Sequence, residues 1–364
     1  MSGEDEDEDL NFPPGHVVET SKSRYTVLKL LGEGGFGAVY LVSNKEGTKA
    51  AMKVERKNTR RKDSKLKMEI AILKAITESK HFTRIMDRGK HEQGTLDAHY
   101  FYLVMELVGK NLQDLRNGCV GKFFSFGTGL GVADQCLEAI KELHQNGFIH
   151  RDIKPHNYAC GLGPQKHTIF ILDFGIARKY MNKNSEIKTP REKVGFKGTV
   201  PFAPLACHRG VEMAPKDDCE SWFYLLIDLT LPGHLPWRKM SERSAVFLAK
   251  QNARTDGSLF VDLKQTTELS KILHYLDMLE YHDKVDYDFI HMNLVEACRA
   301  VGVGIDDPYD WEMPQKSMAE KTAVETPKGD KRTDTDPKRS LSDNRKTDKE
   351  KAKGGDEVRK KAVK

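Results

Sequence analysis

Residues 148–157 read FIHRDIKPHN, and this stretch decides how the rest of the chain is interpreted. It places two imidazoles, a guanidinium, a carboxylate, an ammonium and an amide within ten positions, starting with the apolar pair Phe148 and Ile149. Three interpretations are open: a metal site, a group of ion pairs, or catalytic machinery. Metal binding is disfavoured, because His150 and His156 lie six residues apart and no third ligand stands at a metal-binding spacing from them.

The spacing of polar groups in this stretch favours phosphoryl-transfer chemistry. Asp152, Lys154 and Asn157 fit the pattern HRDxxxxN, in which a carboxylate accepts the proton of a substrate hydroxyl. The ammonium offsets charge on the transferred phosphoryl group, and the amide oxygen binds Mg²⁺. A second apolar stretch, IFILDFG, reaches Asp173 sixteen residues after Asn157, which leaves room for a short hairpin. Asp173 then supplies the hard oxygen ligand that Mg²⁺ requires.

Upstream, the stretch GEGGFGAV places Gly32, Gly34 and Gly37 in a GxGxxG pattern. Alone this signal is weak, and a flexible hairpin is the alternative. A dinucleotide-binding fingerprint needs a helix after the glycines, whereas residues 39–42 continue as a strand. The pattern therefore predicts a strand-turn-strand flap whose amides approach phosphate oxygens, because glycine has no Cβ.

A candidate ion pair lies just beyond this flap. Lys53 sits in the apolar strand AAMKV, where a lysine by itself would point to solvent. Leu66, Ile70 and Leu73 recur at helical spacing, and Glu69 lies one turn before Leu73 on roughly the same face. If that face packs on the sheet, a Lys53–Glu69 ion pair holds the ammonium toward the flap.

A small β-rich part precedes a larger helical part. RYTVLKLL, GAVYLV and TKAAMKV indicate a meander of short strands, and further strands are expected at residues 85–87 and in HYFYLVMEL. VADQCLEAIKELHQNG carries a helical apolar stripe and ends at Gly147, a C-cap residue. DCESWFYLLIDLTL is apolar on nearly all faces, which is typical of a helix in the middle of a large domain. These patterns predict the fold class α+β.

Composition suggests a folded domain between two polar tails. The chain has 364 residues, 38% of them hydrophobic, and a formal net charge of +5 that is unevenly spread. An acidic run, SGEDEDED, opens the chain, and a basic polar tract closes it, so both ends are predicted to be disordered. The predicted segments are an acidic segment 1–22, a domain 23–312 and a basic tail 313–364. Within the domain we expect a β-rich lobe over 23–105, a hinge over 106–109 and a helical lobe over 110–312.

The cysteines favour a reducing compartment. All six stand singly, without CxxC spacing, so neither a disulfide framework nor a zinc site is indicated. The longest apolar run is well short of the roughly 20 residues that a membrane span needs. We therefore expect a cytoplasmic protein, with a nuclear pool as an open alternative, and no membrane partner.

The order of these motifs resembles a eukaryotic protein kinase from about residue 25 to about residue 311. HRDIKP followed by GT at Gly198 and Thr199 resembles the serine/threonine class. KDDCESWFYLLIDLTLPGHLPWRKM is similar to the casein kinase 1 superfamily. GFKGTV, LPWRK and DPYDWE look most like its tau-tubulin kinase branch.

This resemblance implies a bilobal protein kinase fold, an ATP-dependent protein serine/threonine kinase activity, and the cofactors ATP and Mg²⁺. It also implies that Asp218 braces the backbone of the catalytic loop. The implied catalytic residues are Asp152, Lys154, Lys53 and Glu69, and the implied metal ligands are Asn157 and Asp173. The implied ATP-binding residues are Leu31, Gly32, Glu33, Gly34, Gly35, Phe36, Gly37, Ala38, Val39, Ala51, Lys53, Met105, Glu106 and Val108.

The substrate-binding segment departs from the family pattern. The APE motif is missing, and Thr199 is followed by Val200, Pro201 and Phe202 where relatives carry an arginine and an aromatic residue. Pro201 removes both a cation and a backbone donor. Arg191 and Lys197 are the remaining candidates, with Thr199, for binding acidic or already phosphorylated substrates; a solvated basic loop is the alternative.

The implied partners are proteins phosphorylated on Ser or Thr, of acidic, primed or cytoskeletal type, and the protein is expected to be a monomer. The resemblance further implies activity without phosphorylation of the activation segment. Two other classes stay open: a kinase-like scaffold without catalysis, and a protein that binds polyanions through its basic tail. Specific nucleic-acid recognition is disfavoured, because the tail interleaves acidic residues and has no aromatic side chains for base stacking.

Overall fold

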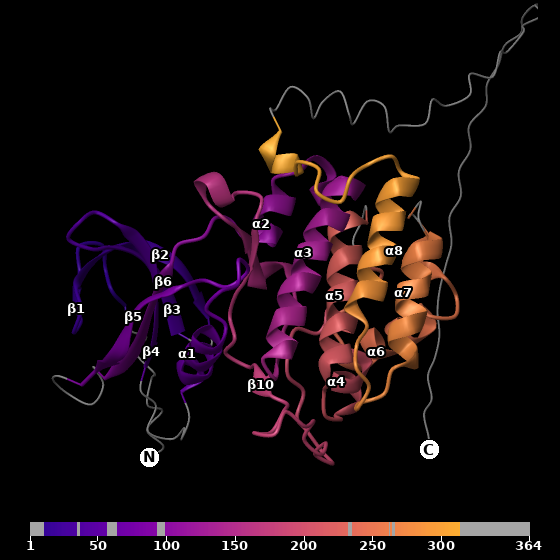
Figure 1. Cartoon of the computed structure of the whole chain (residues 1–364), viewed down its shortest axis with the longest axis horizontal. Coiled ribbons are helices and arrows are strands. Elements are labelled where there is room, and N and C mark those ends of the chain that lie inside the picture. Colours follow the sequence, from indigo (N-terminus) through magenta and orange to yellow (C-terminus); the bar gives the residue numbers. More distant parts are fainter. Residues whose placement is uncertain are drawn as a thin grey trace, which may run out of the picture. The chain divides into compact units, whose positions relative to one another are not determined.

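The computed structural model in Figure 1 describes residues 11–34, 37–56, 64–92, 99–231, 235–261, 263 and 266–313. Gly35 and Phe36, the acidic run at the start and the basic tail after residue 313 lie outside the described residues. None of the helices in the described part is both long enough and apolar enough to span a membrane.

The N-terminal part is a six-stranded sheet in the order β1-β2-β3-β4-β6-β5. The predicted meander is confirmed, because β2, β3 and β4 are antiparallel neighbours. Side chains alternate between the two faces along each strand: Ala50, Met52 and Val54 are buried on one face of β4, which leaves Lys53 on the other. The strands are β1 (Val17–Glu19), β2 (Arg24–Gly34), β3 (Gly37–Ser43), β4 (Lys49–Arg56), β5 (Ile85–His91) and β6 (Tyr100–Glu106).

The sheet includes a strand that lies before residue 23, where the domain was predicted to start. Val17–Glu19 pairs with the start of β2, and the preceding Phe12 is buried. Its ring stacks on His16 at 4.5 Å between centroids and packs against Tyr40 at 5.4 Å. An aromatic residue in a polar segment thus anchors that segment to the sheet, because burying it removes apolar surface from water.

Helix α1 (Lys65–Ala75) follows β4 and packs on β5 and β6. Its buried face consists of Leu66, Glu69, Ile72 and Leu73. Ile70, which was predicted to lie on this face, is only half-buried. Glu69 is therefore turned toward the sheet by the three apolar residues around it.

The larger part is helical and has α5 at its centre. Every residue of α5 except Lys216 is buried, as the apolar pattern predicted. Helix α5 packs against α3 and α7, and α8 packs against α3 and α7; these helices run side by side in Figure 1. The helices are α2 (Leu112–Asn117), α3 (Phe126–Gln145), α4 (Leu205–Arg209), α5 (Pro215–Thr230), α6 (Arg243–Asn252), α7 (Thr266–Met278) and α8 (Tyr287–Ala300).

Two short antiparallel ladders frame the loops between α3 and α4. β7 (Phe148–Ile149) pairs with β10 (Arg178–Lys179), and β8 (Tyr158–Cys160) pairs with β9 (Ile169–Ile171), which is the predicted hairpin. Residues 150–157 connect β7 to β8 and contain the 3-10 turn η3 (Pro155–Asn157). The remaining 3-10 turns are η2 (Val120–Lys122), η4 (Gly163–Gln165), η5 (Ser258–Phe260) and η6 (Asp310–Glu312). The predicted α+β class is confirmed.

Candidate active site

The loop between β7 and β8 presents a carboxylate, an ammonium and a hydroxyl to one another. Lys154 Nζ donates to Asp152 Oδ2 at 2.7 Å and to Thr199 Oγ1 at 3.0 Å. Thr199 Oγ1 in turn donates to Asp152 Oδ1 at 2.7 Å. Asp152 is buried and Lys154 is half-buried. The structure therefore brings two segments of the chain, the HRD loop and the GT dipeptide, to one carboxylate.

The backbone of this loop is fixed by Asp218, at the start of α5. Its carboxylate accepts the N–H groups of His150 at 2.6 Å and Arg151 at 2.8 Å, and His144 Nε2 lies 2.9 Å away. Burial acts to raise the pKa of Asp218, but these donors outweigh it and the pKa is lowered. Arg151 has a positive φ of 69°, a conformation that a non-glycine residue adopts only when its surroundings hold it there. The predicted brace is present.

Asn157 stabilises the loop through a hydrogen bond to another residue of the same loop. Its amide nitrogen donates to the backbone oxygen of Asp152 at 2.8 Å, and Asn157 is buried. Because the amide nitrogen is engaged, the amide oxygen is the atom left to bind a cation.

The predicted Lys53–Glu69 ion pair is present and gains a third member. Lys53 Nζ lies 2.7 Å from Glu69 Oε2 and 2.8 Å from Asp173 Oδ1. Burial acts to lower the pKa of Lys53, but the two carboxylates outweigh burial and the pKa is raised. Lys53 is therefore a permanent cation held beside the DFG aspartate.

The DFG turn is locked by its phenylalanine. Phe174 is buried, stacks on Phe82 at 5.6 Å between centroids and contacts the ring of His150 at 5.4 Å. Asp173 has a φ of 62°, in the left-handed region, and accepts the N–H of Gly175 at 3.3 Å. Strand β9 and the buried phenylalanine together fix the direction of the carboxylate.

The glycine flap is a β-hairpin, as predicted, with Gly34 opposite Gly37 in the ladder between β2 and β3. Gly37 has a φ of 109°, and a Cβ there would lie 2.0 Å from the backbone oxygen of Val54. No other residue fits, so this glycine is required for the flap to close on β4. Of the predicted ATP-binding residues in the flap, Ala38 is buried, Gly37 and Val39 are half-buried, and Leu31, Gly32, Glu33 and Gly34 are exposed.

The segment after β6 offers backbone groups for a ligand. Ala51 and Met105 are cross-strand partners and both are buried. The N–H of Glu106 is already donated to Arg84 O at 3.0 Å. Within the described residues, neither the N–H nor the C=O of Val108 has a hydrogen-bond partner. Val108 is thus the available donor and acceptor in the predicted hinge.

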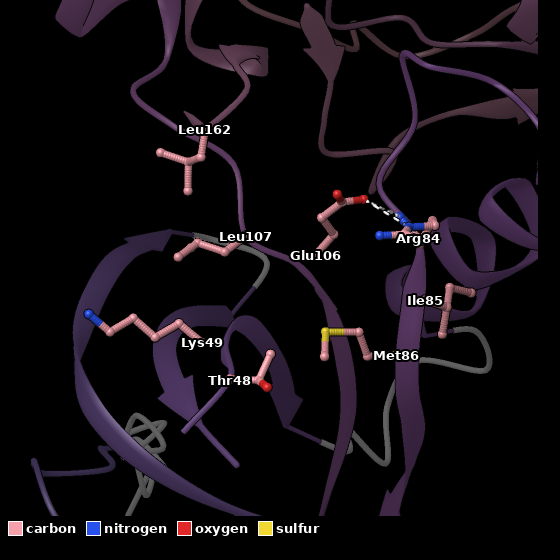
Figure 2. A pocket seen from close by; sticks show the side chains of 8 residues that line it. All are labelled: Thr48, Lys49, Arg84, Ile85, Met86, Glu106, Leu107 and Leu162. Carbon is pink, nitrogen blue, oxygen red and sulfur yellow. Dashed lines mark hydrogen bonds and ion pairs between the residues drawn. The ribbon is translucent and has the colours of Figure 1, made fainter. Parts of the chain in front are cut away.

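A hollow of about 600 Å³ adjoins this hinge and is separate from the catalytic cluster. In Figure 2 the Glu106 carboxylate turns toward Arg84, whose Nε lies 3.4 Å from it. None of the residues around the carboxylates Asp152 and Asp173 lines this hollow. Its lining consists of Thr48, Lys49, Arg84, Ile85, Met86, Glu106, Leu107 and Leu162.

A charge cluster that sequence reasoning missed joins the segment between Asp173 and Thr199 to Glu212. The buried Glu212 carboxylate accepts a bidentate pair of hydrogen bonds from Arg191, with Arg191 Nη2 at 3.0 Å from Oε1, and Arg178 Nε lies 3.5 Å from Oε1. Of the two predicted substrate-binding cations, Arg191 is thus paired with Glu212, whereas Lys197 is exposed. No motif marks Glu212; the one signal is an acidic residue within the otherwise apolar stretch GVEMAP.

Gly198 fits this segment closely against the catalytic loop. It has a φ of 119°, and a Cβ there would lie 2.7 Å from the backbone oxygen of Arg151. Glycine at this position therefore lets Thr199 reach Asp152.

Comparison with known proteins agrees with this geometry. Residues 25–275 match the family described as protein kinase domain. The chain is 33% identical over 317 residues to a probable serine/threonine-protein kinase of Dictyostelium discoideum. The aligned region covers 86% of this chain and 60% of that relative. It is 30% identical over 317 residues to the serine/threonine-protein kinase spe-6 of Caenorhabditis elegans, covering 84% of this chain and 81% of the relative. A putative serine/threonine-protein kinase of Caenorhabditis elegans is 31% identical over 301 residues, covering 80% and 87%.

This chain therefore spans 60% of the length of the first of these relatives and more than four fifths of the other two. The family match runs through the flap, the Lys53–Glu69 pair, the HRD loop and the DFG turn. Because the residues that build the catalytic cluster lie inside that match, the chain belongs to the protein kinase family, among its serine/threonine-protein kinases.

Proposed function

We propose that this kinase transfers the γ-phosphoryl group of Mg·ATP to Ser and Thr hydroxyls of protein substrates, as a member of the tau-tubulin kinase branch of the casein kinase 1 superfamily. The observation that carries the chemistry is the Asp152 carboxylate, which contacts Lys154 and the Thr199 hydroxyl at once. A substrate hydroxyl that enters this pocket finds an acceptor for its proton and a cation beside it.

In the reaction, the substrate oxygen bonds to the γ-phosphorus while the bond from that phosphorus to the β,γ-bridging oxygen breaks and ADP leaves. Asp152 orients the hydroxyl and receives its proton, and Lys154 stabilises the negative charge on the transferred group. Positioning and electrostatic stabilisation supply most of the rate in such transfers. Asp152, Lys154 and Thr199 are already hydrogen-bonded together, so little rearrangement is needed.

The phosphates and the metal would lie between the flap and the DFG turn. Lys53, oriented by Glu69, would bind the phosphate oxygens together with the flap amides. Asn157 and Asp173 fit a Mg²⁺ ion, because both offer hard oxygen ligands and Asp173 Oδ1 is the atom bonded to Lys53, which leaves Oδ2. When bound, Mg²⁺ supplies positive charge to the β- and γ-phosphates.

The adenine would lie between the flap and the hinge. Val39 and Ala51 would cover one face of the ring, with Leu31 and Ala38 from the flap beside it. Met105 would close the back of the pocket. Glu106 and Val108 would meet the polar edge of adenine through backbone groups, of which the Val108 groups are unoccupied within the described residues.

Assignment to the branch rests on the motifs GFKGTV, LPWRK and DPYDWE. The last two motifs make hydrogen bonds to distant parts of the chain. Trp237 Nε1 donates to the backbone oxygen of Pro201 at 2.8 Å. Asp310 accepts hydrogen bonds from the backbone and hydroxyl of Ser125, the N-cap of α3, at 2.8 and 2.6 Å. LPWRK thus supports the substrate-binding segment, and DPYDWE fixes the start of a core helix.

The test of the chemistry is transfer of labelled phosphate from Mg·ATP to casein. We expect wild-type protein to label Ser or Thr, and Asp152→Asn to lower kcat by roughly 10²–10⁴-fold, because the amide cannot accept a proton. Asp288→Asn, an exposed carboxylate on α8, is the matched control and should keep full activity. Wild-type protein that binds ATP but transfers no phosphate to casein, tubulin or a tau-like protein would show a non-catalytic scaffold instead.

The test of the branch is substrate preference. We propose acidic, primed or cytoskeletal substrates, since Lys197 is exposed beside Thr199. Rates on casein, tubulin, a tau-like protein and a basic peptide should rank the basic peptide last. Equal rates on all four would count against the branch assignment.

We further propose a monomer in the cytoplasm, with a nuclear pool as the alternative. All six cysteines are free, five of them buried, as suits a reducing compartment. Light scattering on the purified protein and fractionation of cells test these two statements. A stable dimer, or recovery only with membranes, would overturn them.

A further inference from the structure

Helix α6 carries a lysine that is fully buried, with 0% of its surface exposed. The ammonium of Lys250 donates to the backbone oxygens of Val200 at 2.9 Å and Ala203 at 2.6 Å. Its third donor faces His208 Nε2 at 3.2 Å. Two N–H groups of the ammonium therefore have carbonyl acceptors in the substrate-binding segment, and His208 Nε2 accepts the third when the imidazole proton is on Nδ1.

Within the described residues, this cation has no carboxylate partner within ion-pair distance. Glu220, a carboxylate whose charge acts on Lys250, is engaged by Arg254 at 2.8 Å and by the Tyr224 hydroxyl at 2.6 Å. The ammonium instead lies 4.8 Å from the ring centre of Tyr224 and 5.6 Å from that of Trp237. Burial of a charge without a counter-ion is costly, and the carbonyl dipoles and ring faces offset part of that cost.

The carbonyls that Lys250 holds belong to a compact turn that begins at Thr199. The N–H groups of Phe202 and Ala203 both donate to Thr199 O at 2.9 Å. The carbonyl of Pro201, which lies between Val200 and Ala203 in the chain, accepts the indole N–H of Trp237. A continuous set of hydrogen bonds thus runs from α6 through residues 200–203 to Thr199 and on to the Asp152 carboxylate.

We propose that Lys250 is the positioning residue for protein substrates: it fastens residues 200–203 from beneath, and so sets the surface that a substrate meets beside the hydroxyl pocket. This inference rests on the proposed protein kinase activity. Lys250 touches neither ATP nor the substrate hydroxyl. Its effect should therefore fall on protein-substrate binding and spare nucleotide binding.

Lys250→Met tests the proposal, because methionine keeps most of the volume and loses the three donors. We expect KM for casein to rise about tenfold, while KM for ATP changes less than twofold. A tenfold change corresponds to about 1.4 kcal/mol, the size of one lost hydrogen bond. Lys271→Met, an exposed lysine on α7, is the matched control and should leave both KM values unchanged.

Two further variants separate positioning from folding. Lys250→Gln retains two N–H donors without the charge and should recover part of the casein affinity. Trp237→Phe removes the donor to Pro201 together with part of the buried ring that faces Lys250, and it should raise KM for casein in the same direction as Lys250→Met. Equal rises in both KM values, or no rise in KM for casein with a folded variant, would overturn the proposal.

Amide hydrogen exchange reports on the loop without requiring turnover. In Lys250→Met, the amides of Phe202 and Ala203 should exchange about tenfold faster, with α5 unchanged. If the wild type proved inactive, the proposed function would fail while this measurement would still decide the role of Lys250. Unchanged exchange at both amides would refute the role, and faster exchange throughout α5 would show a general structural one.

Discussion

Substitution of Glu212 tests whether the activation segment, residues 175–199, must be phosphorylated to be ordered. In many protein kinases, arginines around the catalytic loop are ordered by a phosphorylated residue of this segment. Here the carboxylate of Glu212 already binds Arg191 and Arg178, and its charge also acts on Arg151 of the catalytic loop. We expect the segment to be ordered by this carboxylate alone.

The free energy that Glu212 contributes depends on how far its ion pairs are exposed to solvent. The Glu212 side chain is 3% exposed, whereas Arg191 is 46% and Arg178 is 29% exposed. A hydrogen bond to a charged group contributes about 1.5–3 kcal/mol when desolvated, and solvent screening of the half-exposed arginines reduces this. We expect the Glu212→Gln change to remove about 2 kcal/mol, which shifts the equilibrium between the ordered and open segment by about 30-fold.

The assay is kcat/KM for casein phosphorylation, measured before and after phosphatase treatment. Glu212→Gln should lose activity by up to about 30-fold, and phosphatase should leave the wild type unaffected. Glu192→Gln, an exposed glutamate of the same segment, is the matched control. Wild-type activity that phosphatase abolishes, or a Glu212→Gln variant within twofold of wild type, would refute the reasoning.

Three other predictions address the tail, the brace and the buried lysine. Deletion of the residues after Glu312 should leave casein phosphorylation largely intact, as a rate comparison will show; loss of activity with the fold preserved would contradict this. Asp218→Asn should lower kcat about tenfold or more, since it weakens the brace on His150 and Arg151; rates close to wild type in a folded variant would contradict the brace. Burial lowers the pKa of Lys250 to about 7. The unfolded state therefore binds more protons from pH 7 to about 10, and wild-type stability should rise with pH relative to Lys250→Met by roughly 1 kcal/mol per unit. The titratable and charged groups around this position, His208, Glu220, Cys207 and Arg254, are the same in the wild type and in Lys250→Met. The measurement is the free energy of unfolding by chemical denaturation at pH 7, 8 and 9. The same pH dependence in both proteins would contradict loss of the Lys250 charge in the folded state.

Much of the fold could be predicted because the spacing of apolar residues along the chain indicates which side chains are buried. The meander from β2 to β4, the hairpin of β8 and β9 and the buried helix α5 each follow from their apolar patterns. Phe12 is buried although its segment is polar in composition, so composition alone could not predict its contact with the sheet. The boundary at residue 23 stays a prediction. The apolar spacing likewise pointed to Ile70 instead of Ile72, because the two flank the line from Leu66 to Leu73 on opposite sides and the pattern fits either.

The candidate site could be predicted where motifs carry fixed spacing. Asp152, Lys154 and Asn157 are close in sequence, so their proximity follows from one loop. The contact between Lys53 and Asp173 spans 120 residues, and only the arrangement of two separate segments creates it. Spacing can indicate that each residue belongs to a site, but it cannot show which distant partner fixes its pKa.

Glu212 and Lys250 were missed for a related physical reason. Lys250 binds backbone carbonyls, which are present in every sequence and so give no signal. Glu212 binds arginines that stand at no characteristic spacing from it. Pro201 makes this visible, because it has no N–H to donate and contributes to the turn only through its carbonyl, which accepts the Trp237 N–H. Because the Val200 and Pro201 side chains are half-buried, they can differ while these hydrogen bonds stay, whereas Phe202 is buried in the core. The surface offered to substrates can therefore change while Thr199 stays on Asp152, and the place where the family pattern breaks is where specificity is free to vary.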